Sequence, residues 1–96
     1  MQIVFSGADD ELLCQSPMVI PTGTIEEEGI RSVRDALSYL HRAEPRAHNS
    51  FFNKDGTIAN GIICLLDGVD TELTDCSEQT DLSDSELVLI STLHGG

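Results

Sequence analysis

An apolar stripe at helical spacing, between two segments rich in β-forming residues, constrains the fold of this sequence most. The stripe lies on one face of a helix and consists of Ile30, Val33, Leu37 and Leu40. Glutamates at positions 26–28 precede it and basic residues at 41, 42 and 46 follow it, an order that suits the helix dipole. Pro45 cannot continue a helix and so ends it. We expect one main helix whose stripe packs in the core.

Strand signals lie on both sides of this helix. Residues 1–6 alternate weakly between polar and apolar side chains, and residues 17–22 carry three β-formers bounded by prolines, which favours an edge strand. Residues 61–66 form a nearly continuous apolar run, which is typical of a strand buried on both faces. Asp67-Gly68 predicts a turn into a short strand at 69–73, and residues 86–92 predict the last strand.

Polar connections with isolated apolar residues make up the rest. Phe51 and Phe52 interrupt the connection 46–60, and we interpret them as core side chains. Residues 74–85 form an acidic loop from which Leu82 can reach the core. Two strands, a helix and further strands around one core predict an α+β domain of the β-grasp type, a mixed sheet packed on one main helix. For 96 residues we expect one domain over 1–92 and a short flexible tail over 93–96.

The charge distribution is strongly one-sided. The formal net charge is −12, all five Lys and Arg residues lie between Arg31 and Lys54, and every charged residue from Asp67 to Glu86 is acidic. Direct nucleic-acid binding is therefore disfavoured, because phosphate contacts need a basic face. Two interpretations of the acidic surface stay open together: it keeps a small protein in solution, and it steers the protein toward a basic partner surface.

The cysteines show no metal or redox motif. Cys14, Cys64 and Cys76 are widely spaced and form no Cys-x-x-Cys pair. An odd number of cysteines without a disulfide framework favours a reducing, cytoplasmic location. Cys64 lies in the apolar run, where a buried structural thiol is expected. We see no signal peptide and no apolar stretch near the roughly 20 residues of a membrane helix, so no membrane association is expected.

Catalytic and cofactor motifs are absent from the sequence. It has no Gly-rich phosphate loop, no Gly-x-Ser-x-Gly elbow, no His-Glu-x-x-His helix and no calcium loop. We therefore expect a carrier and substrate of other enzymes, with no bound metal or cofactor of its own.

The chain ends in Gly95-Gly96, directly after the predicted last strand. Composition alone gives a Gly-Gly ending a chance of about 0.5%. Because glycine has no Cβ, such an ending can thread a narrow channel toward an enzyme that adenylates a terminal carboxylate. The alternative is a frayed end without a role.

The ending from Ile90 to Gly96, Ile-Ser-Thr-Leu-His-Gly-Gly, resembles the C-terminus of the ubiquitin-related modifier family of sulfur carriers and protein modifiers. The resemblance covers roughly the C-terminal half and continues upstream through Pro45, Asp55-Gly56, the block 61–66, Asp70, Glu72-Leu73 and residues 85–96. Ubiquitin itself carries arginines before its glycines. The matching stretch here, Ser91 to His94, has none, which argues for a different activating enzyme.

This resemblance implies a ubiquitin-like fold with the first and last strands parallel at the sheet centre. It also implies that a ubiquitin-activating-like enzyme with a sulfurtransferase domain, using ATP and magnesium, adenylates the Gly96 carboxylate and converts it to a thiocarboxylate. A tRNA thiolase complex would take the sulfur for 2-thiolation of the wobble uridine. The same activated terminus could be joined to lysines of target proteins. Leu93, His94 and Gly95 would then be the residues that the activating enzyme recognises.

Lys54 is the only lysine, so its side chain and the α-amino group of Met1 are the only amines that could accept self-conjugation. Three alternatives to the carrier stay open. They are a protein-conjugation tag, a passive ubiquitin-like interaction module, and a sulfur carrier of the molybdopterin or thiamine type, whose endings resemble this one less. The sequence does not separate carrier from tag, because both use the same activated carboxylate.

Overall fold

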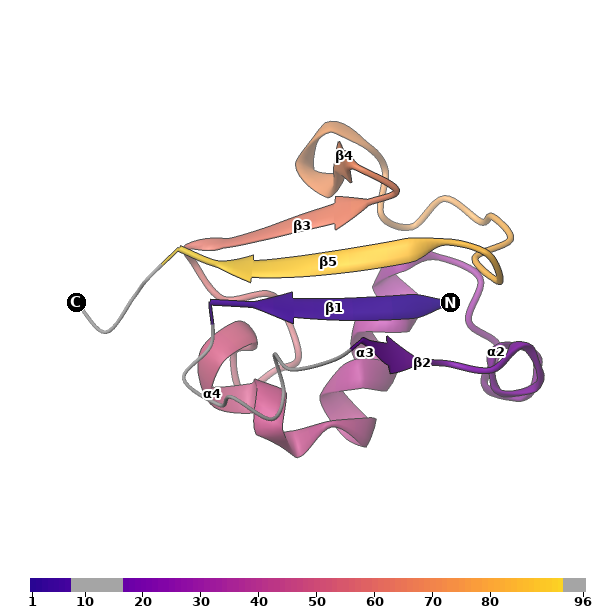
Figure 1. Cartoon of the computed structure of the whole chain (residues 1–96), viewed down its shortest axis with the longest axis horizontal. Helices are drawn as coiled ribbons and strands as arrows, with labels where there is room; N and C mark the ends of the chain where they lie inside the picture. Colours follow the sequence, from indigo (N-terminus) through magenta and orange to yellow (C-terminus); the bar gives the residue numbers. More distant parts are fainter. Residues whose placement is uncertain (8–16, 93–96) are drawn as a thin grey trace.

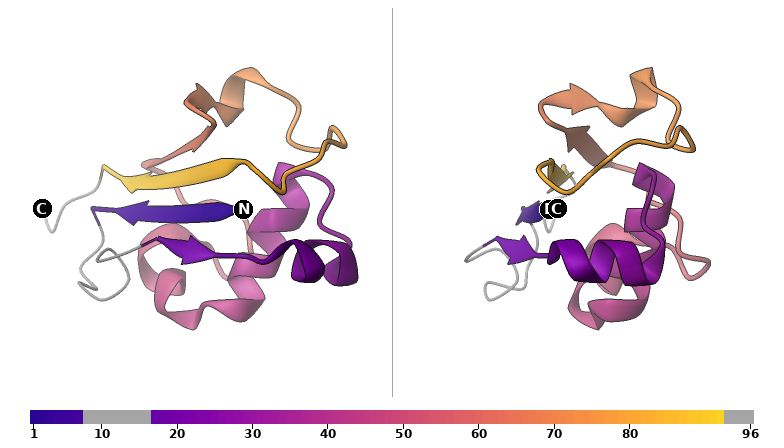
Figure 2. Two further views of the ribbon diagram at one scale, coloured as in Figure 1. Left: turned by 45° about the vertical axis from the view of Figure 1, so that its right-hand side comes forward. Right: turned by 90° about the vertical axis from the view of Figure 1, so that its right-hand side faces the viewer.

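The computed structural model describes residues 1–7 and 17–92 of this chain. A five-stranded sheet with the order β2-β1-β5-β3-β4 forms one layer, and helix α3 packs across one of its faces (Figures 1 and 2). Strands β1 (Gln2–Ser6) and β5 (Glu86–Ser91) are parallel neighbours, in register from Gln2↔Glu86 to Ser6↔Ile90. The α+β class and the central parallel pair are confirmed.

The outer strands complete a mixed sheet. Strand β2 (Met18–Val19) pairs antiparallel with β1, β3 (Ile62–Leu66) pairs antiparallel with β5, and β4 (Val69–Asp70) pairs antiparallel with β3. The hairpin between β3 and β4 turns at Asp67 and Gly68, with φ angles of 50° and 85°, as the Asp-Gly pair predicts. The strand expected over 69–73 is shorter, because Thr71–Leu73 forms a 3-10 helix, η2, capped by the Asp70 carboxylate.

The predicted main helix is α3, and a second helix, which the sequence analysis did not predict, precedes it. Helix α2 (Thr22–Glu28) ends at Gly29, which adopts a φ of 67°, and α3 (Val33–Ala43) begins after Ser32. The hydroxyl of Ser32 accepts a hydrogen bond from the Asp35 N–H at 3.1 Å and caps α3. The glutamates at 26–28 therefore belong to a separate helix, which corrects the expectation that they lead into the main one. No helix of the described residues is long and apolar enough to cross a membrane.

Short helices and buried aromatic rings follow α3. The helix ends before Pro45, as predicted, and η1 (Pro45–Ala47) and α4 (His48–Phe51) come next. Phe51 is fully buried and its ring lies 5.1 Å from that of Phe5 on β1, centroid to centroid. The interpretation of Phe51 and Phe52 as core side chains is confirmed, and Leu82 of the acidic loop is buried as well.

Strand β3 is buried on one face only, so the expectation of burial on both faces is wrong. Cys64 points into the core and is 5% exposed, whereas its neighbour Ile63 is 40% exposed. The physical reason is that α3 covers one face of the sheet (Figure 2). The side chains of alternate strand residues point to the other face.

Candidate functional site

Strand β5 leads the chain to the end of the sheet from which the C-terminal residues continue. Because β5 and β1 run in the same direction, Thr92 lies at the opposite end of the sheet from Met1 (Figure 1). The Thr92 N–H donates to the carbonyl of Gly61 at 2.9 Å, and its hydroxyl donates to the same oxygen. The sheet therefore fixes the position from which residues 93–96 begin.

Four predicted site residues lie outside the described residues: Leu93, His94, Gly95 and Gly96. Their recognition and activation remain predictions. The expectation of an exposed, flexible tail beyond Thr92 falls on the same residues.

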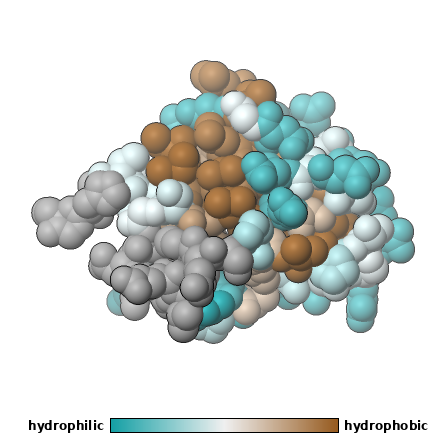
Figure 3. Space-filling view, in the orientation of Figure 1, coloured by the Kyte–Doolittle hydropathy of each residue, from teal (hydrophilic) through white to brown (hydrophobic). Residues whose placement is uncertain are grey.

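An apolar surface lies beside Thr92 on the open face of the sheet. We call it the sheet-face patch, and it consists of Val4, Ile63, Leu65, Val88 and Ile90. Ile63 is exposed and the other members are half-buried. Ile63 and Ile90 are register partners next to the Ile62–Ser91 pair, so the patch reaches the end of β5. Figure 3 shows this apolar area over β3 and β5.

Further exposed apolar side chains lie at the β4 edge of the sheet but outside the patch, because the register sets Val69 against Leu66 on the covered side. Val69 on β4 is 50% exposed, and Leu73 on η2 is 81% exposed. Exposed apolar side chains that gather on one face, rather than singly, indicate a surface for a protein partner. The apolar run 61–66 could have indicated this surface, but the sequence does not distinguish an exposed apolar face of a strand from a buried one.

The opposite end of the sheet face is acidic. Asp67 lies in the β3–β4 turn and Glu86 begins β5. The Asp67 carboxylate accepts a hydrogen bond from the Glu86 N–H, and the Asp67 N–H donates to the Glu86 carbonyl, both at 2.9 Å. Negative charge is thus held at the end away from Thr92, and a partner on the patch meets it along one margin.

Aspartates of the loop 74–85 also organise its backbone. The Asp75 carboxylate accepts from the N–H and the hydroxyl of Ser77, at 2.9 and 2.5 Å, and the Asp81 carboxylate accepts from the Ser83 N–H at 2.9 Å. The hydrogen bonds from these serines lower the pKa of Asp75 and of Asp81. This role was not predicted, although the spacing Asp-x-Ser in the sequence is typical of a turn in which the aspartate side chain binds the backbone two residues on.

Lys54 lies in an exposed turn between α4 and β3. The Gly56 N–H closes the turn on the Asn53 carbonyl at 3.1 Å, and the Asp55 carboxylate accepts from the Thr57 N–H at 3.0 Å. Hydrogen bonds from Thr57 lower the pKa of Asp55. The other predicted acceptor, the amino group of Met1, donates to the carbonyls of Ile20 and Ser83 at 3.0 and 2.8 Å. Of the two amines, the structure leaves that of Lys54 exposed.

Two histidines share a cavity of about 470 Å³ with Lys54. The rings of His41 and His48 stack with centroids 4.3 Å apart, and His48 Nε2 hydrogen-bonds to the His41 carbonyl. Within residues 1–7 and 17–92, no group of three or more His, Cys, Asp or Glu side chains is arranged to hold a metal ion.

Sequence relatives extend over the whole chain. A family model described as Urm1 (Ubiquitin related modifier) matches residues 1–96. Ubiquitin-related modifier 1 of Encephalitozoon cuniculi is 31% identical over 96 residues, which cover all of both chains. Ubiquitin-related modifier 1 homolog 2 of Arabidopsis thaliana is 29% identical over 92 residues, which cover 94% of this chain and 93% of the relative.

Solved structures of similar fold come from the archaeon Haloferax volcanii. A crystal structure of SAMP1 superposes with a TM-score of 0.64 at 24% identity, covering 99% of this chain and 97% of that chain. A structure of small archaeal modifier protein 1 gives a TM-score of 0.62 at 23% identity, covering 96% and 95%. This likeness establishes the ubiquitin-like β-grasp fold. The family model and the relative from Encephalitozoon cuniculi, which both match the full length, show that the chain belongs to the ubiquitin-related modifier family of ubiquitin-like modifiers and sulfur carriers.

Proposed function

We propose that this chain is a cytoplasmic sulfur carrier whose Gly96 is adenylated and thiocarboxylated, and that it supplies sulfur for 2-thiolation of the tRNA wobble uridine. The observation that carries the proposal is the course of β5. This central strand passes an exposed apolar patch and continues, through Thr92, into a Gly-Gly ending. Membership of the family supports it.

The chemistry belongs to an activating enzyme, which brings ATP and magnesium. The Gly96 carboxylate attacks the α-phosphorus of ATP, pyrophosphate leaves, and a mixed anhydride forms. The terminal sulfur of a cysteine persulfide on the partner then attacks the acyl carbon and displaces AMP. A second partner thiol attacks the cysteine sulfur of this acyl disulfide, so that its S–S bond breaks, a disulfide forms on the partner and the thiocarboxylate leaves. A tRNA thiolase complex then takes the sulfur.

The chain itself contributes binding and positioning. In this proposal the sheet-face patch supplies apolar contact to the activating enzyme, and the acidic end of the sheet favours a basic rim on that enzyme. The hydrogen bonds between Thr92 and Gly61 hold the base of the tail against the sheet. Such positioning matters because a displacement of about 1 Å at a reacting centre can cost on the order of a hundredfold in rate.

Removal of Gly96 tests the carrier function. We expect the truncated protein to lose adenylation by a factor on the order of one hundred or more while its thermal unfolding is unchanged, because Gly96 lies five residues beyond the last strand, Glu86–Ser91. The assay is ATP–pyrophosphate exchange with the cognate activating enzyme. Retained exchange in the truncated protein would remove the carboxylate from the mechanism.

A second output, conjugation to lysines of target proteins, follows from the same activated carboxylate. The exposed Lys54 then becomes the side-chain acceptor for self-conjugation. We expect Lys54→Arg to remove self-linked chains built through a lysine and to leave tRNA thiolation unchanged, because arginine keeps the charge but offers no nucleophilic amine. A blot for conjugates and a thiolation assay measure the two outputs. Loss of thiolation in this variant would show that Lys54 contacts a partner of the sulfur pathway.

If the chain acts mainly as a conjugation tag, the pool of free protein differs. The intact mass of the protein from its native cell separates the two proposals, because a carrier accumulates with one terminal oxygen replaced by sulfur. A tag without carrier activity shows only the carboxylate and its conjugates.

A further inference from the structure

Two cysteines that are far apart in sequence meet at one residue in the fold. The Cys76 thiol donates to the backbone carbonyl of Thr71 at 3.5 Å. The β3–β4 register pairs Leu65 with Asp70, so Thr71 follows beside Cys64, and η2 packs on β3. Cys76 packs against the core cluster that contains Cys64. The β3–β4 hairpin and η2 reverse the chain between the two cysteines and bring them to the same edge of the sheet. The sequence does not indicate this proximity, because the two cysteines do not form a Cys-x-x-Cys motif.

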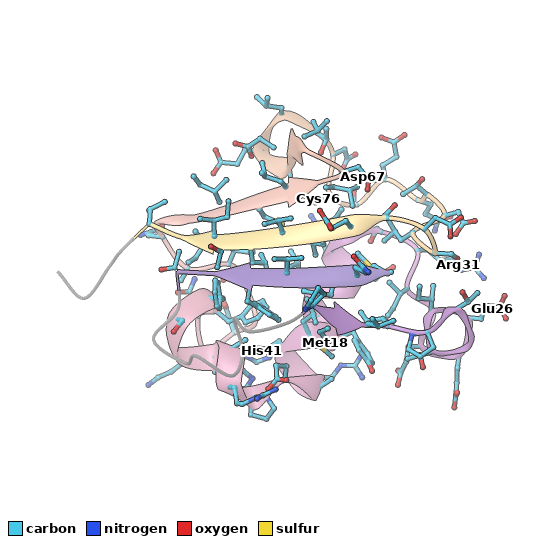
Figure 4. All side chains as sticks on the ribbon, in the orientation of Figure 1. Met18, Glu26, Arg31, His41, Asp67 and Cys76 are labelled. Atoms are coloured by element: carbon cyan, nitrogen blue, oxygen red, sulfur yellow. The ribbon has the colours of Figure 1, made fainter. Side chains whose placement is uncertain are left out.

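The two thiols differ in access. Cys64 is 5% exposed on the core face of β3. Cys76 is half-buried at the margin of the core and lines a cavity of about 300 Å³ together with Arg34 and Leu37. The Arg34 N–H donates to the Cys76 carbonyl at 3.0 Å and holds this turn against α3. Figure 4 shows Cys76 beside β3. A small reagent therefore reaches Cys76 first.

We propose that Cys76 and Cys64 form a reversible intramolecular disulfide, with Cys76 as the thiol that reacts with a small-molecule disulfide and Cys64 as the thiol that resolves the product. In the first step the Cys76 thiolate attacks one sulfur of oxidised glutathione, whose S–S bond breaks and releases one glutathione thiolate. In the second step Cys64 gives its proton to solvent and attacks the Cys76 sulfur, and the second glutathione leaves. Two protein thiols are oxidised and one glutathione disulfide is reduced to two thiols.

The burial of Cys64 predicts the rate of the second step. Desolvation raises the pKa of the Cys64 thiol to about 11, opposed by the Thr71 hydrogen bond and reinforced by Cys76 and Asp70, the titratable groups that act on it. Only the thiolate attacks a disulfide. Closure of the ring should therefore accelerate about tenfold for each pH unit between pH 7 and 9. The mixed disulfide at Cys76 is the species expected to accumulate near neutral pH.

Closure of this disulfide would join β3 to the turn after η2. The closed segment carries Leu65 of the sheet-face patch and the exposed apolar side chains of Val69 and Leu73. We expect the oxidised protein to unfold at a temperature higher by on the order of 10 °C, because the cross-link lowers the conformational entropy of the unfolded chain. The redox state would thus set how rigidly this edge of the partner surface is held.

Tryptic mapping tests the proposal on the full chain. No Lys or Arg follows Lys54, so Cys64 and Cys76 fall in the peptide 55–96, whereas Cys14 falls in the peptide 1–31. The protein is incubated with oxidised glutathione at pH 7, 8 and 9, quenched with acid, alkylated and digested. We expect the peptide 55–96 to lose two hydrogen atoms and both alkylation sites, faster at higher pH, and dithiothreitol to restore both.

Two variants serve as controls. Cys76→Ser removes the reactive thiol without disturbing the buried one, and we expect its peptide 55–96 to keep one alkylated cysteine. A double variant, Cys76→Ser with Ser77→Cys, moves the thiol by one exposed position and should take up glutathione without closing a ring. Ring closure in the double variant, a stable mixed disulfide at pH 9 in the wild type, or a disulfide that joins the peptides 1–31 and 55–96 would overturn the proposal.

Discussion

The two faces of the sheet are built from the same strands and even from neighbouring residues, yet they serve different ends. On the face under α3, Leu87 and Leu89 of β5 are fully buried, together with Ile3 of β1. On the other face, Val88 and Ile90 are half-buried and lie beside the exposed Ile63. Both faces are apolar. One is apolar because the fold needs a core, whereas no helix of residues 17–92 packs over the other and explains its composition.

This difference teaches that the period of two along a strand can separate folding from recognition. A side chain on the covered face loses its water on folding, and its truncation leaves a cavity. A side chain on the open face keeps much of its exposure until a partner binds. Substitutions at adjacent positions of one strand should therefore have effects on different measurements.

The largest expected effect is on the covered face. We expect Leu89→Ala to lower the free energy of unfolding by about 2–5 kcal/mol, because it removes a fully buried side chain between β1 and β3. Its neighbour Ile90→Thr should cost about 1 kcal/mol or less, because threonine keeps the β-branched shape on a half-buried face. Urea denaturation of both variants measures the contrast. Equal losses would mean that the open face is structural, and the comparison of the two faces would fail.

The sequence reveals the covered face better than the open one. The helical stripe, the two phenylalanines and the strands β1 and β5 were predictable, because burial demands apolar side chains at fixed periods. The apolar run 61–66 predicts that Ile63 is buried, because an apolar residue on an open face cannot be told from a buried one by its residue type. The break at Gly29 and the cap at Ser32 were missed, although Ser32 and Asp35 have the spacing of a capping motif.

The next effect concerns binding by the open face. We expect Ile63→Thr to weaken binding of the activating enzyme by about tenfold, the scale of one partly exposed apolar anchor at an interface. Val19→Thr is the matched control, because Val19 is 61% exposed on the same open face but lies on the edge strand β2, which β1 and β5 separate from Ile63. Binding is measured by titration calorimetry and stability by thermal melting.

In this pair of variants, the comparison predicts a change of affinity without a matching change of stability. If Val19→Thr weakens binding as much as Ile63→Thr, the partner covers the whole sheet and the patch is not its centre. If neither variant alters binding, the partner recognises the tail alone.

The candidate site was predicted from its ending rather than from its geometry. The residues Ile90 to Gly96 and the lone Lys54 could be named from the sequence, because a terminal glycine pair and a single amine need no fold to be recognised. The patch beside Thr92 could not, because it depends on the register that sets Ile63 against Ile90. The meeting of Cys64 and Cys76 at Thr71 depends on the same hairpin and was equally hidden.

The smallest expected effect tests the loop 74–85, which lies outside both faces except for the buried Leu82. The hydrogen bonds from Ser83 hold the pKa of Asp81 below its ordinary value of 3.8 in the folded protein. A carboxylate whose pKa is lower in the folded than in the unfolded protein stabilises the fold. This contribution is complete at pH values above the unfolded pKa, and it is lost as the pH falls through the folded pKa. Asp81→Asn should therefore be slightly less stable than the wild type at pH 7, and the gap should begin to close once the pH falls below the unfolded pKa of about 3.9. Asp84→Asn changes the charge of the same loop equally and serves as the control, and urea midpoints at pH 7, 4 and 3 give the comparison.

A stability gap between Asp81→Asn and the wild type that stays constant across this pH range would show that the loop aspartates act through charge alone. The loop would then belong with the acidic margin that faces a partner, rather than with the covered face that holds the fold together.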